Sequence, residues 1–583
     1  MQLGTAPPRG SPGPSKSRGM WPLRDRPAVV WLALAALVAL THQYVPSARW
    51  LMVHLVLLGA ITHSIMVWSA YFAQALLKTP PTLDDRRVQS WRLWLLLAGT
   101  TVVLIGVPTA QWWLVILGGA LVALAVIWHG VQLVRRLRRA LPGRFRITIA
   151  YYLSACAMLP VGITFGVLLA RGGAWHGRLL VGHTMVNLLG WVGLTVIGTL
   201  LTLWPTILRA RVDERAERWA KQALPVLVGA LVVVVAGVLV DLRALAVAGI
   251  VLYILGVCWW GRALIRPARA RPPRSFPAAS VGAALVWLLV GLVVVAVTVA
   301  GSSSWSEVAG AFGPATAIFV AGAAAQVLLG ALSYLLPVAL GGGPAALKAA
   351  AGKFDAYGAA RITVTNLGLL ICLLPVPSWV RVACSVCVLV GLASFLPILV
   401  AAVLARRRVL REREAGTAGP GGAAGRAAAG GKGGAASSAS TGPGGAAGRA
   451  AAGGPGAAAA SAPTGAASAA SAGPAEPGTR AAAGAGRRPR TSVVARESTF
   501  WSRGQLMGGL AAVLLAVSLG VAADPAAAGL AGQGTGLQAA VEPTGHTTTV
   551  QVEARDMRFF PEHISVPEGD RLVIELTNTD DGN

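Results

Sequence analysis

Long apolar runs, separated by short polar and basic stretches, occupy most of residues 28–404. A helix of about 20 apolar residues spans the hydrocarbon core of a bilayer, which is about 30 Å thick. Most of the runs approach this length, so the pattern predicts a mainly α, polytopic membrane helix bundle. The twelve predicted segments are residues 28–43, 50–77, 93–108, 113–134, 147–170, 179–208, 223–240, 244–263, 278–300, 315–340, 362–378 and 379–404.

The distribution of basic residues supports this division. Loops after the even-numbered segments carry clusters of arginine and lysine, as in residues 135–146 and 262–274. Loops after the odd-numbered segments hold few. Because lysine and arginine are enriched in cytoplasmic loops, we expect the even-numbered loops and both ends of the twelve-segment module to face the cytoplasm.

Composition narrows the class of protein further. The chain is 55% hydrophobic and 13% charged, whereas a soluble domain averages about 25% charged residues. The net charge of +27 would suit nucleic-acid binding, but the basic residues lie between apolar segments, so we expect the lipid bilayer as partner and no nucleic acid. The five cysteines all lie in apolar segments. Cys384 and Cys387 are therefore interpreted as helix-packing residues, and no disulfide framework is expected.

Outside the module, three segments precede the C-terminal tail. Residues 1–27 are rich in proline, glycine and arginine and are predicted to be a disordered cytoplasmic N-terminus. Residues 406–503 begin with basic residues and continue as an alanine- and glycine-rich tract, predicted to be a flexible cytoplasmic linker. Residues 504–524 form a single apolar helix. This helix either anchors the C-terminal segment in the membrane or acts as an export signal that is removed by cleavage.

The hydrophobic pattern is different in the tail, residues 547–583. Val550 and Val552 alternate with polar residues, as do Leu572, Ile574 and Leu576. This alternation predicts β-strands with one apolar face, the start of an incomplete β-sandwich. Three strands cannot close a sandwich, so we expect the sequence to be a fragment of a longer protein.

Histidines inside apolar segments are the candidate functional residues. His54 and His63 lie in the second segment and His183 in the sixth. An ionisable ring in the membrane is costly and therefore suggests a function. His54 and His183 lie about one turn from the same end of their helices, so the spacing places them at matching depth, where two neutral imidazoles can bind a haem or one metal. His63 is predicted to lie on the opposite face of a straight helix from His54.

Structural interpretations of the same residues remain open. The histidines would then hydrogen-bond backbone carbonyls and hold helices together. Asn187 lies one turn after His183 and either orients it or joins two helices. Gln326 is expected to form helix–helix hydrogen bonds or to line the same interior. Three further histidines are expected at the membrane interface, namely His42, His129 and His176.

The tail resembles the opening strands of a cupredoxin domain. The residues that carry the resemblance are 557–559, 564–566, 572–574 and Asn578. In that family the copper ligands come later in the domain. His546 and His563 do not match ligand positions, so the resemblance implies copper only beyond the residues present, with no metal site in this segment.

The whole chain resembles actinobacterial membrane-fused multicopper oxidases, including copper nitrite reductases, on residues 50–72, 183–209 and 326–343. The module also loosely resembles twelve-span haem-copper proteins, both subunit I of respiratory oxidases and the nitric-oxide-response membrane haem proteins. Respiratory oxidases carry further histidines in the later helices. The seventh, eighth and tenth segments here have none, which excludes a complete oxygen-reducing binuclear centre and leaves a haem or a single metal.

These resemblances imply a membrane-anchored copper oxidoreductase in the plasma membrane. Its module would bind haem and pass electrons from quinone or another donor to extracytoplasmic copper domains. A different class remains as the alternative, a polytopic transporter or metal-handling membrane protein with a cupredoxin-like appendage. A purely structural anchor is less consistent with twelve segments. Oligomeric state is left open.

Overall fold

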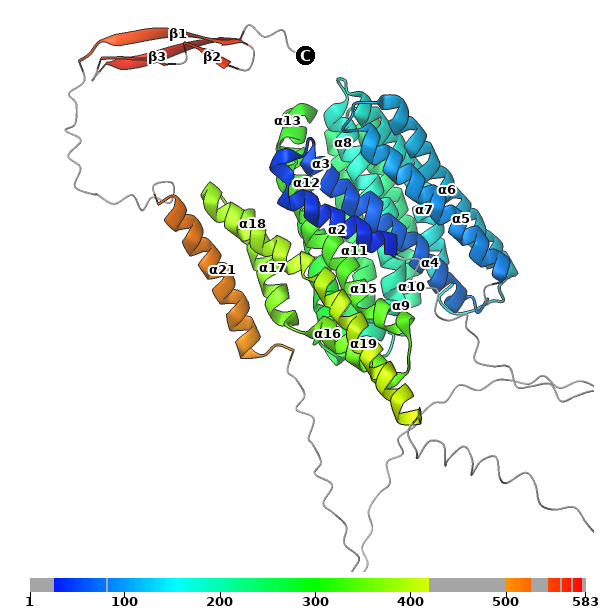
Figure 1. The fold of residues 1–583 in the computed structure, drawn as a ribbon. Helices are drawn as coiled ribbons and strands as arrows, with labels where there is room; N and C mark the ends of the chain where they lie inside the picture. The colour runs from blue at the N-terminus through cyan, green and yellow to red at the C-terminus, as the bar shows by residue number, and fades with distance from the viewer. Residues whose placement is uncertain are drawn as a thin grey trace, which may run out of the picture.

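The computed structural model describes residues 26–79, 82–418, 500–525, 544–555, 558–561, 563–567 and 570–578. A bundle of long helices dominates these residues (Figure 1). Eleven helices in the described part are long and apolar enough to cross a membrane, which confirms the predicted polytopic helical class. Two further predicted segments are helices of 15 residues each, α2 (Arg26–Leu40) and α17 (Gly358–Cys372).

Seven of the spans are single continuous α-helices: α5 (Leu83–Gly106), α6 (Trp112–Arg139), α7 (Ile147–Arg171), α10 (Ala216–Leu239), α11 (Arg243–Ala270), α12 (Phe276–Gly301) and α21 (Arg503–Ala523). Shorter connecting helices are η2 (His42–Tyr44), α13 (Trp305–Gly310) and α16 (Pro344–Asp355). Towards the end of the bundle, α18 (Ser378–Ala393) and α19 (Phe395–Ala418) form one long helix broken at Ser394. After residues 419–499, α21 (Arg503–Ala523) is the last apolar helix.

Three spans change from α- to π-helix and back near their middle. They are α3 (Ala48–His54), η3 (Leu55–Ile61) and α4 (Thr62–Leu76); α8 (His176–Thr184), η4 (Met185–Gly193) and α9 (Leu194–Leu208); and α14 (Gly313–Ala317), η5 (Ile318–Ala325) and α15 (Gln326–Leu340). Between 56% and 78% of the apolar window of these three spans is buried, against 44% or less in the other eight. They therefore form the centre of the bundle, and π segments frequently mark functional sites.

Several predicted boundaries were wrong by more than a few residues. The third span begins at Leu83, not near residue 93, because Thr82 and Asp85 cap each other reciprocally and extend the helix through a polar first turn. Arg86, Arg87 and Arg92, expected in a loop, therefore lie in α5. At the other end of the module, α19 continues to Ala418, so the predicted linker, 406–503, begins as a helix.

Other predictions lie partly outside the described residues. The predicted disordered N-terminus, residues 1–27, overlaps the structure only where α2 begins at Arg26. Residues 419–499 of the linker, residues 526–543 after the apolar helix, where cleavage of an export signal would occur, and the terminal Asn583 are not among the described residues.

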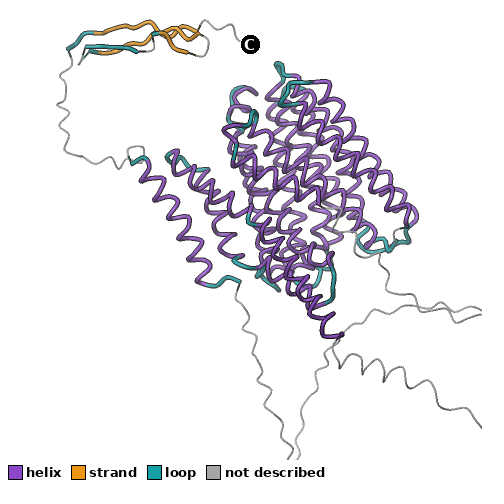
Figure 2. Tube along the Cα trace, in the orientation of Figure 1, coloured by secondary structure: helices purple, strands orange, loops and turns teal. Residues whose placement is uncertain are grey.

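The tail forms a three-stranded sheet of β1 (Thr547–Arg555), β2 (Arg558–Phe560) and β3 (Arg571–Asn578), drawn as strands in Figure 2. The order is β2-β1-β3, with β1 antiparallel to β2 and parallel to β3. Val550 pairs with Ile574 and Val552 with Leu576, so the predicted apolar positions share one face. Ile574 and Leu576 are exposed. The strands are thus confirmed, while a sandwich is not seen in the described residues.

Candidate functional site

A cavity of about 770 Å³ lies among the three central spans, with further walls from α5, α6 and α7. This volume is within the range of about 300–1,000 Å³ that is usual for sites of cofactor size. The cavity starts beside the first residues of α3, α8 and α14, and we call this end of the bundle the cavity end. The polar side chains that line it are Ser47, Arg49, His54, Thr62, His176, His183, Thr184, Asn187 and Thr316.

His54 and His183 face each other across this cavity. Their ring centroids lie 6.2 Å apart and the ring planes are inclined by 32°. The sequence placed the two histidines at matching depth, and in the structure their rings lie close together. One metal ion bound by two Nε2 atoms at about 2 Å from each would hold opposed rings about 6 Å apart between centroids.

Hydrogen bonds orient both rings. The Nδ1 atom of His54 lies 2.9 Å from the carbonyl oxygen of Trp50, and that of His183 lies 3.0 Å from the carbonyl oxygen of Gly162. Because a carbonyl can only accept, the contact with Trp50 requires that Nδ1 of His54 carries the proton and that its Nε2 keeps a lone pair. This is the tautomer and the anchoring by the other ring nitrogen that metal-binding histidines typically show.

Packing around the rings leaves them little freedom. The Trp50 ring stacks on His54 with centroids 4.0 Å apart. On the other side, a Cβ added to Gly166 would lie 2.7 Å from Cε1 of His183, so only a glycine on α7 lets that ring occupy its position. Asn187 Nδ2 donates to the carbonyl oxygen of His183 at 2.8 Å and lies 3.1 Å from Nδ1 of that ring. The amide is therefore in direct contact with His183, as one of the two interpretations of Asn187 required.

His63 lies apart from this pair. It is buried on α4, and the cavity lining includes Thr62 but not His63. The π segment η3 separates it from His54, and the structure does not bring the two rings together. Thr62 instead accepts a hydrogen bond from Trp191 Nε1 at 3.1 Å.

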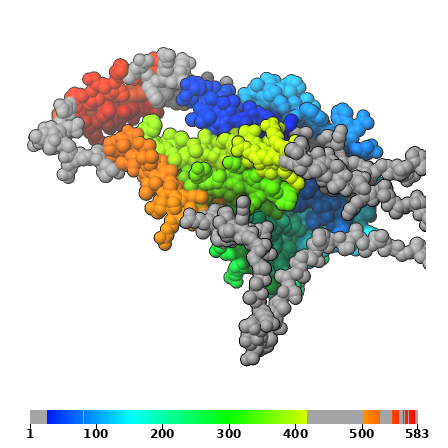
Figure 3. Space-filling view, turned by 60° about the horizontal axis from the view of Figure 1, so that its bottom comes forward, coloured from blue at the N-terminus to red at the C-terminus, as the bar shows by residue number. Residues whose placement is uncertain are grey.

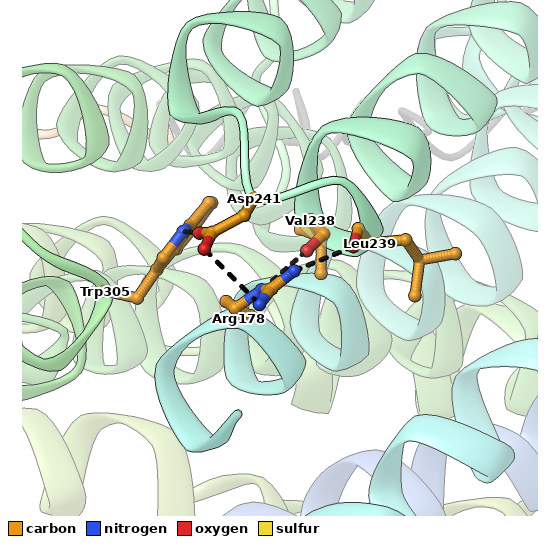
Figure 4. Close-up of polar contacts among 5 residues, drawn as sticks. All are labelled: Arg178, Val238, Leu239, Asp241 and Trp305. Carbon is orange, nitrogen blue, oxygen red and sulfur yellow. Dashed lines mark hydrogen bonds and ion pairs between the residues drawn. The ribbon is translucent and has the colours of Figure 1, made fainter. Parts of the chain in front are cut away.

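The rim at the cavity end is held by a network of polar contacts (Figure 4). Arg178 on α8 donates to the carbonyl oxygens of Val238 and Leu239, at 2.9 and 2.7 Å, and lies 3.5 Å from the Asp241 carboxylate. It thereby satisfies carbonyls at the end of α10 that have no partner within their own helix. Trp305 Nε1 donates to the same carboxylate at 2.6 Å.

The short helix α13 lies over the cavity as a result. Ala309 and Gly310 line the cavity. Gly177 on α8 touches the Trp305 carbonyl so closely that a Cβ there would overlap it. At the start of α13, the backbone and side chain of Ser303 donate to the Glu307 carboxylate and hold its pKa below the usual value. The network therefore fixes the covering helix to α8 and to the end of α10.

Helices α4, α5 and α6 hold a buried polar cluster at the end of the bundle opposite to the cavity end. The sequence did not indicate this cluster. The expected position of His129 at the membrane interface stays a prediction, but its ring is 2% exposed and is therefore buried among these helices. Its Nε2 lies 2.8 Å from Ser69 Oγ, and Ser69 itself donates to the Ile65 carbonyl at 2.6 Å. Since the hydroxyl has one proton, His129 must be the donor to Ser69. Arg92 lies 3.4 Å from Nδ1 of His129, and Arg136 pairs with Asp85 at 3.1 Å.

We expect the Ser69→Ala substitution to destabilise the chain by about 1–3 kcal/mol, because the buried N–H of His129 loses its acceptor. The measurement is thermal unfolding of the purified, detergent-solubilised protein. Ser385→Ala is the matched control, because Ser385 is exposed and its hydroxyl bonds only to its own helix. Equal melting temperatures for the two variants would contradict the role given to Ser69.

Two other residues of interest in the apolar segments, Gln326 and Cys384, make contacts that hold helices together. Gln326 and Asn366 exchange two side-chain hydrogen bonds of 2.9 and 3.1 Å, and Trp287 donates to Asn366. Gln326 is absent from the cavity lining, so helix–helix hydrogen bonding is the interpretation that the contacts support. Cys384 belongs to an apolar packing cluster with Val380 and Ala516.

The number of possible protein ligands decides which kind of metal centre this cavity could hold. In the part of the chain that the structure describes, no three His, Cys, Asp or Glu side chains come together as a metal site. A copper or zinc ion held only by protein ligands normally needs three or more. Haem iron takes four nitrogens from the macrocycle and needs only axial ligands. Two opposed imidazoles in a large apolar cavity therefore fit haem better than a bare ion.

No protein-family model matches the chain, and a comparison with curated proteins likewise found no match.

Proposed function

We propose that the membrane module is a haem-binding electron-transfer unit in which His54 and His183 would hold the haem iron. The observation that carries this proposal is the facing pair of rings, 6.2 Å apart in a cavity of about 770 Å³. Both rings are anchored through Nδ1, an arrangement that favours Nε2 as the atom of each ring that would bind iron. A haem held in this way supplies one-electron chemistry whose potential depends on the axial ligands and on burial.

The residues of the chain prepare that site before any ligand enters. The Trp50 and Gly162 carbonyls anchor the two rings through Nδ1. Leu57, Leu58, Ile163 and Leu180 provide apolar walls that keep water away. The rim network holds α13 over the cavity end. Pre-formed ligand orientation and a dry surround are the means by which a protein tunes a bound metal.

The proposal extends to a membrane-anchored copper oxidoreductase of the multicopper oxidase or copper nitrite reductase type. The distribution of basic loops favours a cavity end that faces away from the cytoplasm. An outward α21 would then put β1–β3 on the same side. The parallel β1–β3 pair with its exposed apolar face, including Ile574 and Leu576, suits one sheet of a cupredoxin-like sandwich. Electrons would come from quinone or another reductant, and copper would be bound outside the described residues.

The deciding experiment is an absorption spectrum of the purified chain, oxidised and then reduced, together with iron and copper analysis. Haem supplied during expression should give a Soret band and sharp α and β bands on reduction, with one iron per chain. A colourless chain without iron, from cells that make haem, would overturn the proposal.

The same cavity favours a second candidate, a transporter or metal-handling membrane protein. Arg49, His176 and the two facing rings would then line a polar route for a solute. Uptake into vesicles by a protein without bound haem would support this candidate. A purely structural anchor would explain neither the cavity nor the oriented rings.

A further inference from the structure

The apolar helix α21 packs against the bundle through a specific surface. It returns after residues 419–499 and lies along α17 and α18, as Figure 1 shows. In Figure 3 the orange segment lies against the yellow-green surface of these helices. The contacts run from Phe500 to Gly520, almost the full length of the helix.

The first contacts are made just before the helix begins. Gly358, at the start of α17, leaves room for the Phe500 ring, which a Cβ at this position would overlap. Trp501 Nε1 donates to the Pro273 carbonyl at 2.9 Å. Gln505 Oε1 accepts from the backbone N–H of Ala359 at 3.1 Å. That N–H belongs to the first turn of α17 and has no acceptor within its own helix, so Gln505 caps α17 from another segment.

One face of α21 continues the contact. Its buried residues are Gly509, Val513, Ala516 and Gly520, which recur every three or four positions and so lie on one side of the helix. A Cβ on Gly509 would lie 3.0 Å from the Ala360 carbonyl oxygen, and one on Gly520 would lie 2.5 Å from the Val380 nitrogen. Close approach through small residues is a usual way for helices to associate in membranes.

The opposite face is different. Leu514, Leu515 and Leu519 are 57–60% exposed, as expected for side chains that meet lipid. A removable export signal needs an apolar core of sufficient length and a cleavage site. It does not need a face of small residues matched to two other helices, nor a glutamine that caps one of them.

We infer that α21 is a permanent thirteenth membrane helix, docked on α17 and α18, and not a signal that is removed. It keeps the β1–β3 segment covalently attached to the membrane module. The inference does not depend on the haem site, because none of its residues line that cavity.

A cysteine cross-link tests the docking. Cys384 of α18 and Ala516 of α21 belong to one packed cluster, so Ala516→Cys should form a disulfide with native Cys384 under mild oxidation. The full-length chain is used, with its other four cysteines replaced by alanine and a protease site inserted within residues 419–499. After cleavage, the two fragments should stay joined on a non-reducing gel and separate on reduction. Leu515→Cys, on the exposed face, is the matched control and should leave the fragments separate.

Two results would overturn the inference. One is equal cross-linking in the two variants: either Leu515→Cys cross-links as efficiently as Ala516→Cys, or neither variant cross-links. The other is a C-terminal fragment, identified by its mass in cells without the protease, that begins after residue 523. A chain of full mass that cross-links only through residue 516 supports the docked helix.

Discussion

We expect that replacing His54 or His183 by alanine abolishes the sharp reduced haem bands that the proposed haem site would give. Each substitution removes one of the two facing rings, and no other histidine in the described residues lies beside the pair to replace it. His176 also lines the cavity but is the first residue of α8, at the cavity end. The measurement is the reduced-minus-oxidised spectrum together with haem content per chain.

His63→Ala is the matched control, since His63 is a buried histidine of the same span that does not line the cavity. It should retain the haem bands. A His54→Ala or His183→Ala protein with an unchanged spectrum would refute the ligand assignment. Loss of the bands in His63→Ala alone would move the assignment to the deeper ring.

We expect that a single methyl group added to α7 lowers the haem affinity nearly as much as loss of a ligand does. In Gly166→Ala the new Cβ would lie 2.7 Å from Cε1 and 2.9 Å from Nδ1 of His183. The ring must move, which breaks its 3.0 Å hydrogen bond to the Gly162 carbonyl and changes its position relative to His54. Loss of such an orienting contact typically costs about 10–100-fold in metal affinity. Haem titration of the purified apoprotein measures the change.

Gly119→Ala provides the comparison. Gly119 lines the same cavity, but its added Cβ would meet only the side-chain ends of Ile163 and Val167, at 3.0 and 3.3 Å. We expect this variant to bind haem with nearly unchanged affinity and spectrum. Equal losses in the two alanine variants would show that cavity volume, and not the position of the His183 ring, controls binding.

Periodicity and charge were sufficient to predict the helices. Every predicted apolar segment is a helix in the structure, because about 20 apolar residues have few stable alternatives in a bilayer. The limits of α5 and α19 were missed, since a capping box and a charged helical extension add polar turns that an apolar count ignores. The facing of His54 and His183 was also predictable, because equal distance from the same helix ends implies equal depth.

The sequence by itself thus determined the polytopic helical class, the positions of the apolar helices, the strands of the tail and the matching positions of the two histidines along their helices. These properties depend on local patterns and on the thickness of the bilayer. Only the tertiary structure decided which helices are central, how the ring nitrogens are anchored, that His129 is buried beside Ser69, and that α21 is docked. Each depends on neighbours far away in the chain, as Gly166 beside His183 and Gln505 beside Ala359 show. No period along the sequence encodes such contacts, because they arise from the way in which separate helices pack.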